Sequence, residues 1–122
     1  MIDFPALGEF YFAEKDKGAW YEFSGEFQAG FPKSRLKLSE KSQVKPIVFT
    51  NDLQFNDIKS SVRMLGSHSA SLAYLASSRG DKCILHYDDL SDVAAGIIIV
   101  RESGAIVQND SKVKKLIVEK LR

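Results

Sequence analysis

The sequence predicts an α/β domain in which helices pack against a mixed β-sheet, and a β-hairpin precedes that sheet. Two aromatic-rich segments near the start indicate the hairpin, and strand-like and helix-like patterns alternate from residue 62 onward. A continuous aliphatic run at Ile97–Val100 indicates a helix that is buried between layers. We place the hairpin and one further strand in residues 1–40, and the α/β part in residues 41–122.

The hairpin is expected from two strands, Glu9–Glu14 and Ala19–Phe23. Both are rich in aromatic residues, which fit a pleated surface. The polar connection Lys15–Gly18 ends in a glycine that supplies the positive φ of a tight turn. A loop is expected from Ser24 to Ser34, and an alternating strand at Arg35–Ser39 follows it.

The middle of the chain is expected to contain two strands and two helices. The strands are Ile47–Thr50 and Val62–Leu65. A short helix is expected at Asp52–Ser60, with Asn51 or Asp52 as its cap. A longer helix is expected at His68–Arg79, where the preceding serine is placed to cap the first turn and a glycine follows the end.

The last third continues the α/β pattern. Lys82–Tyr87 is expected to be a strand, a buried helix runs from about Asp92 to Ser103, and Ala105–Gln108 is a further strand. The tail Val113–Leu121 fits two structures. Its apolar spacing suits one face of a helix, whereas the run Leu116–Val118 suits a strand.

Asp92, at the start of the buried helix, allows two interpretations. A carboxylate in the first turn of a helix interacts favourably with the helix dipole and stabilises the helix by about 0.3 to 1 kcal/mol. A purely structural role is therefore sufficient to explain an Asp at this position. Either Asp89 or Ser91 is expected to be the cap residue. The small residues Ala94–Gly96 beside it permit close approach by another backbone, a ligand or a metal-bound phosphate, although they also suit helix packing.

Composition and charge restrict the classes of function. The chain has 122 residues, of which 44% are hydrophobic and 27% are charged, as is typical of one globular domain. Its formal net charge of +1 provides no field that attracts nucleic acid or a membrane surface, so we expect neither as a partner. The single Cys83, with no signal peptide and no apolar run of bilayer length, indicates a cytoplasmic protein.

Several motifs resemble the inositol monophosphatase family. Asp92–Gly104 closely resembles its C-terminal signature, in which Trp-Asp, two small residues and Gly precede an aliphatic helix that ends in Glu-Ala-Gly-Gly. Arg63–Ser67 resembles the family's Arg-x-x-Gly-Ser turn, and Ala73–Asp81 resembles its helix that ends in Gly-x-x-Asp. Ala6–Ala19 resembles its Glu-x-Tyr-x-Ala and Gly-Ala hairpin. The resemblance implies the C-terminal portion of that fold, with residues 1–40 as a remnant of its N-terminal sheet.

The resemblance also implies a function, which is the hydrolysis of a phosphorylated small molecule with Mg²⁺ ions held by carboxylates. By this resemblance, Asp92 is a metal ligand. Gly66, Ser67 and His68 line the substrate side, where helix-terminal amides face the anion. Leu85 stands in the substrate wall where inositol-specific members carry a Glu, which argues against inositol itself as the substrate.

The sequence also departs from the family pattern. Ser91 replaces the family's Trp, His68 stands where a small residue is usual, and Ala105 stands where a second Gly is usual. The family's other metal ligands lie in an N-terminal half, on a Glu and on an Asp-Pro-x-Asp-Gly-Thr turn that this sequence lacks. We therefore expect the C-terminal part of a phosphatase, produced alone or as one half of a split enzyme, that is inactive without an N-terminal half supplied as a separate chain.

Two other interpretations stay open. In the second interpretation, the chain is a degenerate, non-catalytic assembly module of the same fold. In the third, it is a stand-alone α/β ligand-binding domain. An unpaired edge of the hairpin predicts a homo-oligomer, such as a dimer formed by strand addition. A zinc site made of His68, Cys83 and His86 is disfavoured because their spacing matches no common pattern.

Overall fold

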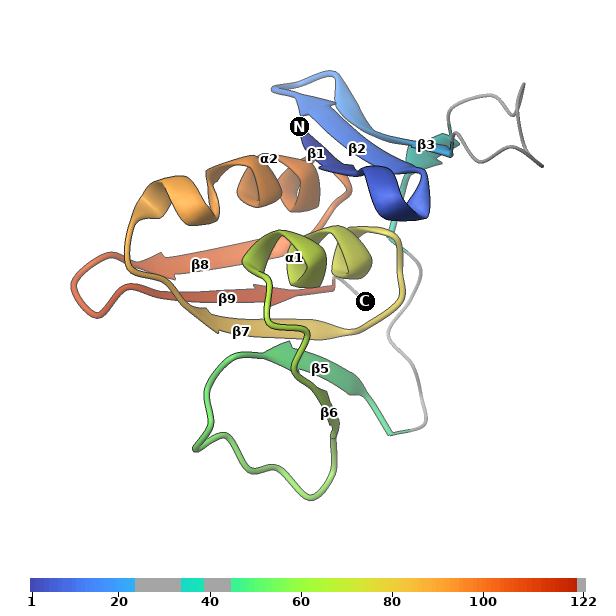
Figure 1. Cartoon of the computed structure of the whole chain (residues 1–122). Coiled ribbons are helices and arrows are strands. Elements are labelled where there is room, and N and C mark those ends of the chain that lie inside the picture. Colours follow the sequence, from blue (N-terminus) through green and yellow to red (C-terminus); the bar gives the residue numbers. More distant parts are fainter. Residues whose placement is uncertain (24–33, 39–44, 121–122) are drawn as a thin grey trace.

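Two β-sheets enclose a layer of two helices in this protein (Figure 1). The structure, a computed structural model, describes residues 1–23, 34–38 and 45–120. The α/β fold class with its preceding hairpin is therefore confirmed. The predicted loop at 24–34 and the boundary near residue 40 lie almost entirely outside the described residues.

The first sheet is antiparallel and has the strand order β1-β2-β3-β4. Its strands are β1 (Ile2–Phe4), β2 (Glu9–Glu14), β3 (Gly18–Phe23) and β4 (Ser34–Leu36), and a 3-10 turn, η1 (Pro5–Leu7), joins the first two. The predicted hairpin is β2 and β3, in which Phe12 lies opposite Trp20. The strand β1 was not expected from the sequence.

The hairpin does not have the unpaired edge that the sequence suggested. β1 pairs with residues 9–11 of β2, and β4 pairs with residues 19–21 of β3. The expectation of an open hairpin edge is thus wrong for residues 9–11 of β2, away from the turn, and for residues 19–21 of β3, next to the turn. Strand addition at these positions would have to displace existing backbone hydrogen bonds.

The second sheet is mixed and has the strand order β6-β5-β7-β9-β8. Its strands are β5 (Ile47–Thr50), β6 (Ser61–Arg63), β7 (Lys82–His86), β8 (Ile106–Asp110) and β9 (Lys115–Glu119). β5 is parallel to both of its neighbours, whereas β9 is antiparallel to β7 and β8. The ambiguous tail is therefore a strand, and its alternate residues Leu116 and Val118 are fully buried.

The helix expected at residues 52–60 is wrong, because this segment forms turns. Asp52 Oδ1 accepts a hydrogen bond from the Gln54 amide at 2.9 Å, and Asp57 Oδ1 accepts one from the Lys59 amide at 3.0 Å. Such local bonds from side chain to backbone compete with helical hydrogen bonding. Two Asp residues therefore keep this segment in a turn conformation.

The two helices are α1 (His68–Ala76) and α2 (Ala94–Glu102). Ser67 caps α1 as expected, since its Oγ accepts a hydrogen bond from the Ala70 amide at 3.1 Å. α1 ends before the expected Arg79 because Ser78 adopts a left-handed conformation, with φ of 64°. Neither helix in the described part of the chain has the length and apolarity needed to cross a membrane.

The start of α2 differs from the expectation. Asp92 lies in a short 3-10 turn, η3 (Leu90–Asp92), and α2 itself begins two residues later. Asp89 is the cap, because its Oδ1 accepts a hydrogen bond from the Ser91 amide at 3.0 Å. In return, Asp92 Oδ2 accepts a hydrogen bond from the Asp89 amide at 3.3 Å, which completes a capping box.

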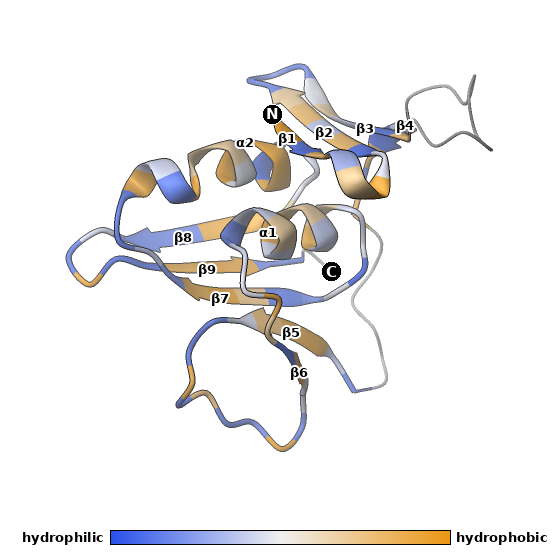
Figure 2. Cartoon of the chain, in the orientation of Figure 1, coloured by the Kyte–Doolittle hydropathy of each residue, from blue (hydrophilic) through white to orange (hydrophobic). Residues whose placement is uncertain are grey.

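Gly96 allows the two helices to approach each other closely. A Cβ atom at this position would lie 2.3 Å from Leu72 Cδ1 and 2.8 Å from Leu72 Cβ on α1. Gly96 therefore serves helix packing, which was one of the two uses considered for Ala94–Gly96. Figure 2 shows that apolar residues gather on both helices and on the central strands β7 and β9.

Glu102, the last residue of α2, connects the helix layer to the hairpin turn. Its Oε1 accepts a hydrogen bond from the Gly18 amide at 2.8 Å, and its Oε2 accepts one from the Asp16 amide at 3.1 Å. Both turn residues have positive φ, 65° at Asp16 and 89° at Gly18. The carboxylate thus satisfies two amides that this turn directs toward the helix end.

Asp81 makes a buried polar connection where β5 and β7 begin and β9 ends. Its Oδ2 accepts a hydrogen bond from the Ile47 amide at 2.8 Å, and its Oδ1 lies 3.7 Å from Lys120 Nζ. Only 5% of Asp81 and 4% of Lys120 are exposed to solvent. The pair therefore links residues at the ends of β5, β7 and β9 in a low-dielectric environment.

Replacing Asp81 with Ala should lower the free energy of unfolding by about 3–5 kcal/mol, because the buried Lys120 ammonium would lose a neighbouring carboxylate and the Ile47 amide would lose its acceptor. Urea denaturation followed by circular dichroism measures this change. The control is Glu119→Gln, which removes the half-exposed ion pair between Lys82 and Glu119 and should cost less than about 1 kcal/mol. Equal losses in the two variants would contradict a special role for Asp81.

Candidate functional site

A small cavity of about 110 Å³ lies at the carboxyl ends of β5 and β7, beside the start of α1. Its lining residues are Thr50, Asn51, Gly66, Ser67, His68, Ser71 and Leu85. All four residues predicted to face a substrate are therefore brought together around one cavity. The carboxyl ends of parallel strands are the usual position of ligand sites in α/β sheets.

The turn before α1 brings one side of the cavity into position. Gly66 has φ of 72°, which favours glycine, and no atom lies within 4 Å of the place where its Cβ would be. Glycine is therefore favoured at this position by the backbone conformation and not by a lack of space for a side chain. Ser67 then caps the helix, and Ser71 Oγ donates a hydrogen bond to the Ser67 carbonyl at 3.0 Å. The first amides of α1 favour a negatively charged group at this end.

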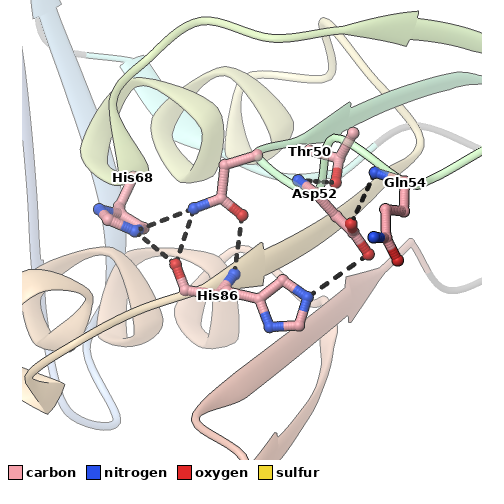
Figure 3. Close-up of polar contacts among 6 residues, drawn as sticks. Thr50, Asp52, Gln54, His68 and His86 are labelled. Atoms are coloured by element: carbon pink, nitrogen blue, oxygen red, sulfur yellow. Dashed lines mark hydrogen bonds and ion pairs between the residues drawn. The ribbon is translucent and has the colours of Figure 1, made fainter.

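Asn51 extends the pairing of β5 with β7 by means of its side chain (Figure 3). The His86 amide donates a hydrogen bond to Asn51 Oδ1 at 2.8 Å, and Asn51 Nδ2 donates one to the His86 carbonyl at 2.7 Å. The side-chain amide thus takes the place of a further backbone position after the end of β5 at Thr50. Sequence reasoning considered Asn51 only as a helix cap and missed this role.

His68 is held by the same carbonyl group. Its Nε2 lies 2.8 Å from the His86 carbonyl oxygen and 3.3 Å from Asn51 Nδ2 (Figure 3). Because a carbonyl oxygen only accepts hydrogen bonds, Nε2 is assigned as the nitrogen that carries the hydrogen. In the neutral ring, Nδ1 is then an acceptor on a side chain that lines the cavity.

Asp52 and His86 form a second polar pair beside the cavity. His86 Nε2 lies 3.5 Å from Asp52 Oδ2, and the Asp52 amide donates a hydrogen bond to Thr50 Oγ1 at 3.0 Å (Figure 3). The hydrogen bond from the Gln54 amide, and after it the contact with His86, holds the pKa of Asp52 below its usual value. The ionised carboxylate therefore stabilises this turn at pH values above the usual pKa of an Asp side chain. This stabilisation is lost as the pH falls through the lowered pKa of Asp52.

Leu85 provides an apolar wall of the cavity and belongs to the core. Only 1% of its surface is exposed, and it lies in one cluster with residues of both helices and both sheets. A leucine side chain offers no hydrogen bond to a substrate hydroxyl. The wall at this position therefore offers a ligand only its shape and an apolar surface.

Asp92 is exposed on η3 and is not among the residues that line the cavity. Apart from its bond to the Asp89 amide, no hydrogen bond or ion pair of its carboxylate is found within the described part of the chain. Residues 1–23, 34–38 and 45–120 contain no group of three or more His, Cys, Asp or Glu side chains that could hold a metal ion. A complete metal centre thus needs ligands beyond those in these ranges.

The disfavoured zinc site is also not formed by the residues that the structure describes. Cys83 is fully buried, its thiol donates a hydrogen bond to the Ser71 carbonyl at 3.3 Å, and burial raises its pKa. A thiol in this state is a poor metal ligand, because the thiolate is the form that binds metal.

Comparison with known proteins gives one family. The model of the inositol monophosphatase family matches residues 1–120. The fructose-1,6-bisphosphatase/inositol-1-monophosphatase of Thermotoga maritima is 30% identical over 121 residues, which are 91% of this chain and 43% of that protein. A bifunctional NADP phosphatase/NAD kinase of Methanococcus maripaludis is 31% identical over 114 residues, which are 84% of this chain and 19% of that protein.

Solved structures agree with the sequence comparison. An inositol monophosphatase from Thermotoga maritima has a TM-score of 0.73 and 28% identity, over 94% of this chain and 48% of that chain. A hypothetical protein from Pyrococcus horikoshii with similarities to inositol-1 monophosphatase has a TM-score of 0.74 and 25% identity, over 97% of this chain and 50% of that chain. These 122 residues thus span about half of the solved chains and less than half of the curated relatives.

Replacing Asn51 with Ala should release the His86 amide. We expect a loss of about 1 kcal/mol in the free energy of unfolding, because both side-chain hydrogen bonds disappear. The exchange rate of the His86 amide should rise by about tenfold or more, since the variant opens locally at the end of β7. Hydrogen exchange followed by NMR measures this rate. Gln54→Ala is the control, because Gln54 acts through its backbone amide, and an equal rise in that variant would contradict the role of Asn51.

Proposed function

The chain belongs to the inositol monophosphatase family, and on this basis we propose that it supplies one half of an Mg²⁺-dependent phosphatase. The substrate would be a phosphorylated small molecule whose phosphate monoester is hydrolysed. The observation that carries the proposal is the cavity at the start of α1, where Gly66, Ser67, His68 and Leu85 lie together. The proposed roles of these residues come from the family motif that they match.

The cavity has the chemistry of a substrate wall. The serines and threonine around it can donate or accept hydrogen bonds, and the first turn of α1 favours an anion. The fully buried Leu85 lines the cavity with an apolar surface, and His68 lines it at a position where a small residue is usual in the family. This combination supports a substrate other than inositol. One relative is named as a phosphatase of both fructose 1,6-bisphosphate and inositol 1-monophosphate, and the other as a phosphatase of NADP.

Asp92 fits the role of a magnesium ligand. It is an exposed oxygen donor, its Oδ2 makes one long hydrogen bond of 3.3 Å, and the capping box restrains its orientation. Mg²⁺ prefers such oxygen ligands and, when bound, lowers the pKa of a water molecule and neutralises phosphate charge. Asp92 would hold the ion at the start of α2, while the first turn of α1 would orient the phosphate.

One carboxylate is too few for this chemistry, so we propose that the remaining ligands come from the half of the fold that these residues do not span. That half would be an N-terminal partner supplied as a separate chain, and this chain would be inactive without it. The single, buried Cys83 supports a reducing, cytoplasmic location. Self-association stays a prediction for the isolated chain.

A non-catalytic assembly module is the second candidate, and two observations favour it. The Asp92 carboxylate already has a structural role in the capping box, and Leu85 has become a core residue. Both positions would then be maintained for folding alone. The two candidates differ in whether Asp92 is needed for turnover or only for the turn.

The proposed phosphatase is tested with Asp92→Asn, which keeps the shape of the side chain but removes its charge. The chain is combined with the part of the Thermotoga maritima relative that it does not cover, and Mg²⁺-dependent release of phosphate from p-nitrophenyl phosphate is measured. Asp92→Asn should reduce the rate by roughly a hundredfold or more, because a metal ligand is weakened.

The matched control is Asp88→Asn, which changes an exposed carboxylate of the same turn region and should leave the rate unchanged. A folded complex that releases no phosphate, or one in which Asp92→Asn has full activity, would support the assembly module instead.

A further inference from the structure

Among the described residues that line the cavity, His68 has the only side chain that exchanges a proton near neutral pH. The others contribute hydroxyl groups, one amide, a glycine and a leucine, none of which titrates in this range. His68 is half-buried and occupies the first position of α1. A histidine in such a place is the usual candidate for proton transfer in a catalytic site.

The hydrogen bond of Nε2 determines which nitrogen of the ring is available to a ligand. Nε2 lies 2.8 Å from the His86 carbonyl oxygen (Figure 3). Because that oxygen only accepts hydrogen bonds, Nε2 carries a hydrogen in both charge states of the ring. No hydrogen bond of His68 Nδ1 is found within the described part of the chain. Nδ1 is therefore the ring atom at which a proton is gained or lost.

Asn51 fixes the peptide group that holds the ring. Its Nδ2 donates a hydrogen bond to the His86 carbonyl at 2.7 Å, and its Oδ1 accepts one from the His86 amide at 2.8 Å. Both charge states of the imidazole donate from Nε2 to this carbonyl, so His68 keeps its orientation when Nδ1 gains or loses a proton. A catalytic group that is already oriented avoids a rearrangement during the reaction.

The first turn of α1 favours an anion next to this ring. Ser67 accepts hydrogen bonds from two amides of the turn, since its Oγ binds the Ala70 amide and its carbonyl binds the Ser71 amide. The amides of His68 and Ser69 precede these two and have no partner within the helix. Free amides at the start of a helix bind phosphate groups. A phosphate bound there lies beside the residue that carries the imidazole.

We propose that His68 is a catalytic acid, which gives its Nδ1 proton to the leaving oxygen of the phosphate monoester. The proposal rests on the proposed function, because it assigns one step of that hydrolysis to this chain. A water oxygen bonds to phosphorus while the bond from phosphorus to the substrate oxygen breaks. The substrate oxygen takes the proton from Nδ1 and leaves as an alcohol.

The remaining protons are exchanged with solvent. The attacking water loses one proton to solvent and becomes part of the phosphate product. Nδ1 of His68 is neutral after the transfer, so it accepts a hydrogen bond from the hydroxyl of the product alcohol. It regains a proton from solvent before the next turnover.

This role indicates the class of substrate. An alkoxide is a strong base and is a poor leaving group until it receives a proton, whereas p-nitrophenolate is stable as an anion. A catalytic acid therefore accelerates the hydrolysis of alkyl phosphates, such as those of sugars and polyols, far more than that of p-nitrophenyl phosphate. His68 thus makes alkyl phosphate monoesters the expected substrates.

Two substrates with different leaving groups test the role of His68. The chain is combined with the complementary part of the Thermotoga maritima relative, and turnover of glycerol 2-phosphate and of p-nitrophenyl phosphate is measured. His68→Gln keeps an N–H donor for the His86 carbonyl but has no proton to transfer. We expect the rate with glycerol 2-phosphate to fall by roughly a hundredfold, and the rate with p-nitrophenyl phosphate by less than about threefold.

His86→Gln is the matched control, because His86 is the other histidine of the chain and does not line the cavity. It should change both rates by the same factor. In His68→Ala, added imidazole should raise the rate with glycerol 2-phosphate by about tenfold, since it replaces the missing acid. Circular dichroism verifies that each variant is folded.

Contact with phosphate is measured on the chain alone, without metal. In NMR spectra of the chain with ¹⁵N-labelled histidine, inorganic phosphate added at constant pH should move the Nδ1 resonance of His68 toward its protonated position. The resonance of His86 is the internal reference and should move several times less.

Three results would overturn the inference. They are equal losses with the two substrates in His68→Gln, no rescue of His68→Ala by imidazole, and a His68 resonance that phosphate does not move. Hydrolysis that requires Asp92 but not His68 would refute the role of His68 and leave the proposed function standing. A complex that hydrolyses neither substrate would refute the proposed function, and the inference with it.

Discussion

The burial of α2 between two sheets is the constraint on which the rest of this structure depends. α2 is too apolar to be left at a surface, and it buries Ile97, Ile99 and Val100 between the layers. Gly96 removes the side chain that would otherwise separate α2 from α1, so the helix layer closes. Glu102 at the end of α2 then binds the hairpin turn, and in this way the helix orients the first sheet relative to the second.

The same helix layer determines where the chemistry can lie. Because α1 packs against α2 through Leu72, its first turn is held at the carboxyl ends of β5 and β7, where the cavity is found. Asp92 precedes α2 on η3. The residue expected to bind metal thus lies before α2, whereas Gly66, Ser67 and His68, expected on the substrate side, lie at the start of α1. Their relative positions depend on one helix contact and on the strands that lead into each helix.

Local patterns in the sequence were sufficient to predict the elements that have a strong period or a distinct cap. The hairpin, both main helices, the Ser67 cap and most strands of the second sheet were predicted in this way. The strand β1 was missed because three residues are too few to show a period. The helix expected at residues 52–60 failed because two Asp side chains bind nearby amides in turns, a competition that apolar spacing does not reveal.

The site shows a different limit of sequence reasoning. Family motifs selected Gly66, Ser67, His68 and Leu85, and the structure brings them to one cavity. Asn51 was missed because its role depends on the end of β5 lying beside the His86 peptide, a relation between residues that are distant in sequence. A polar residue directly after a buried parallel strand is the one local signal that points to such a role.

Selectivity in this cavity follows from the way in which its polar groups are already used. The His86 carbonyl accepts hydrogen bonds from both Asn51 and His68, so these donors are occupied before any ligand enters. Leu85 adds no polar group. Besides the lining hydroxyls, the groups left for a ligand are the start of α1, which favours an anion, and Nδ1 of His68, which accepts a hydrogen bond when the ring is neutral. Under the proposed function, a compound with a phosphate and a nearby hydroxyl would satisfy both groups, whereas the apolar wall at Leu85 would disfavour a ring that presents hydroxyls on every side.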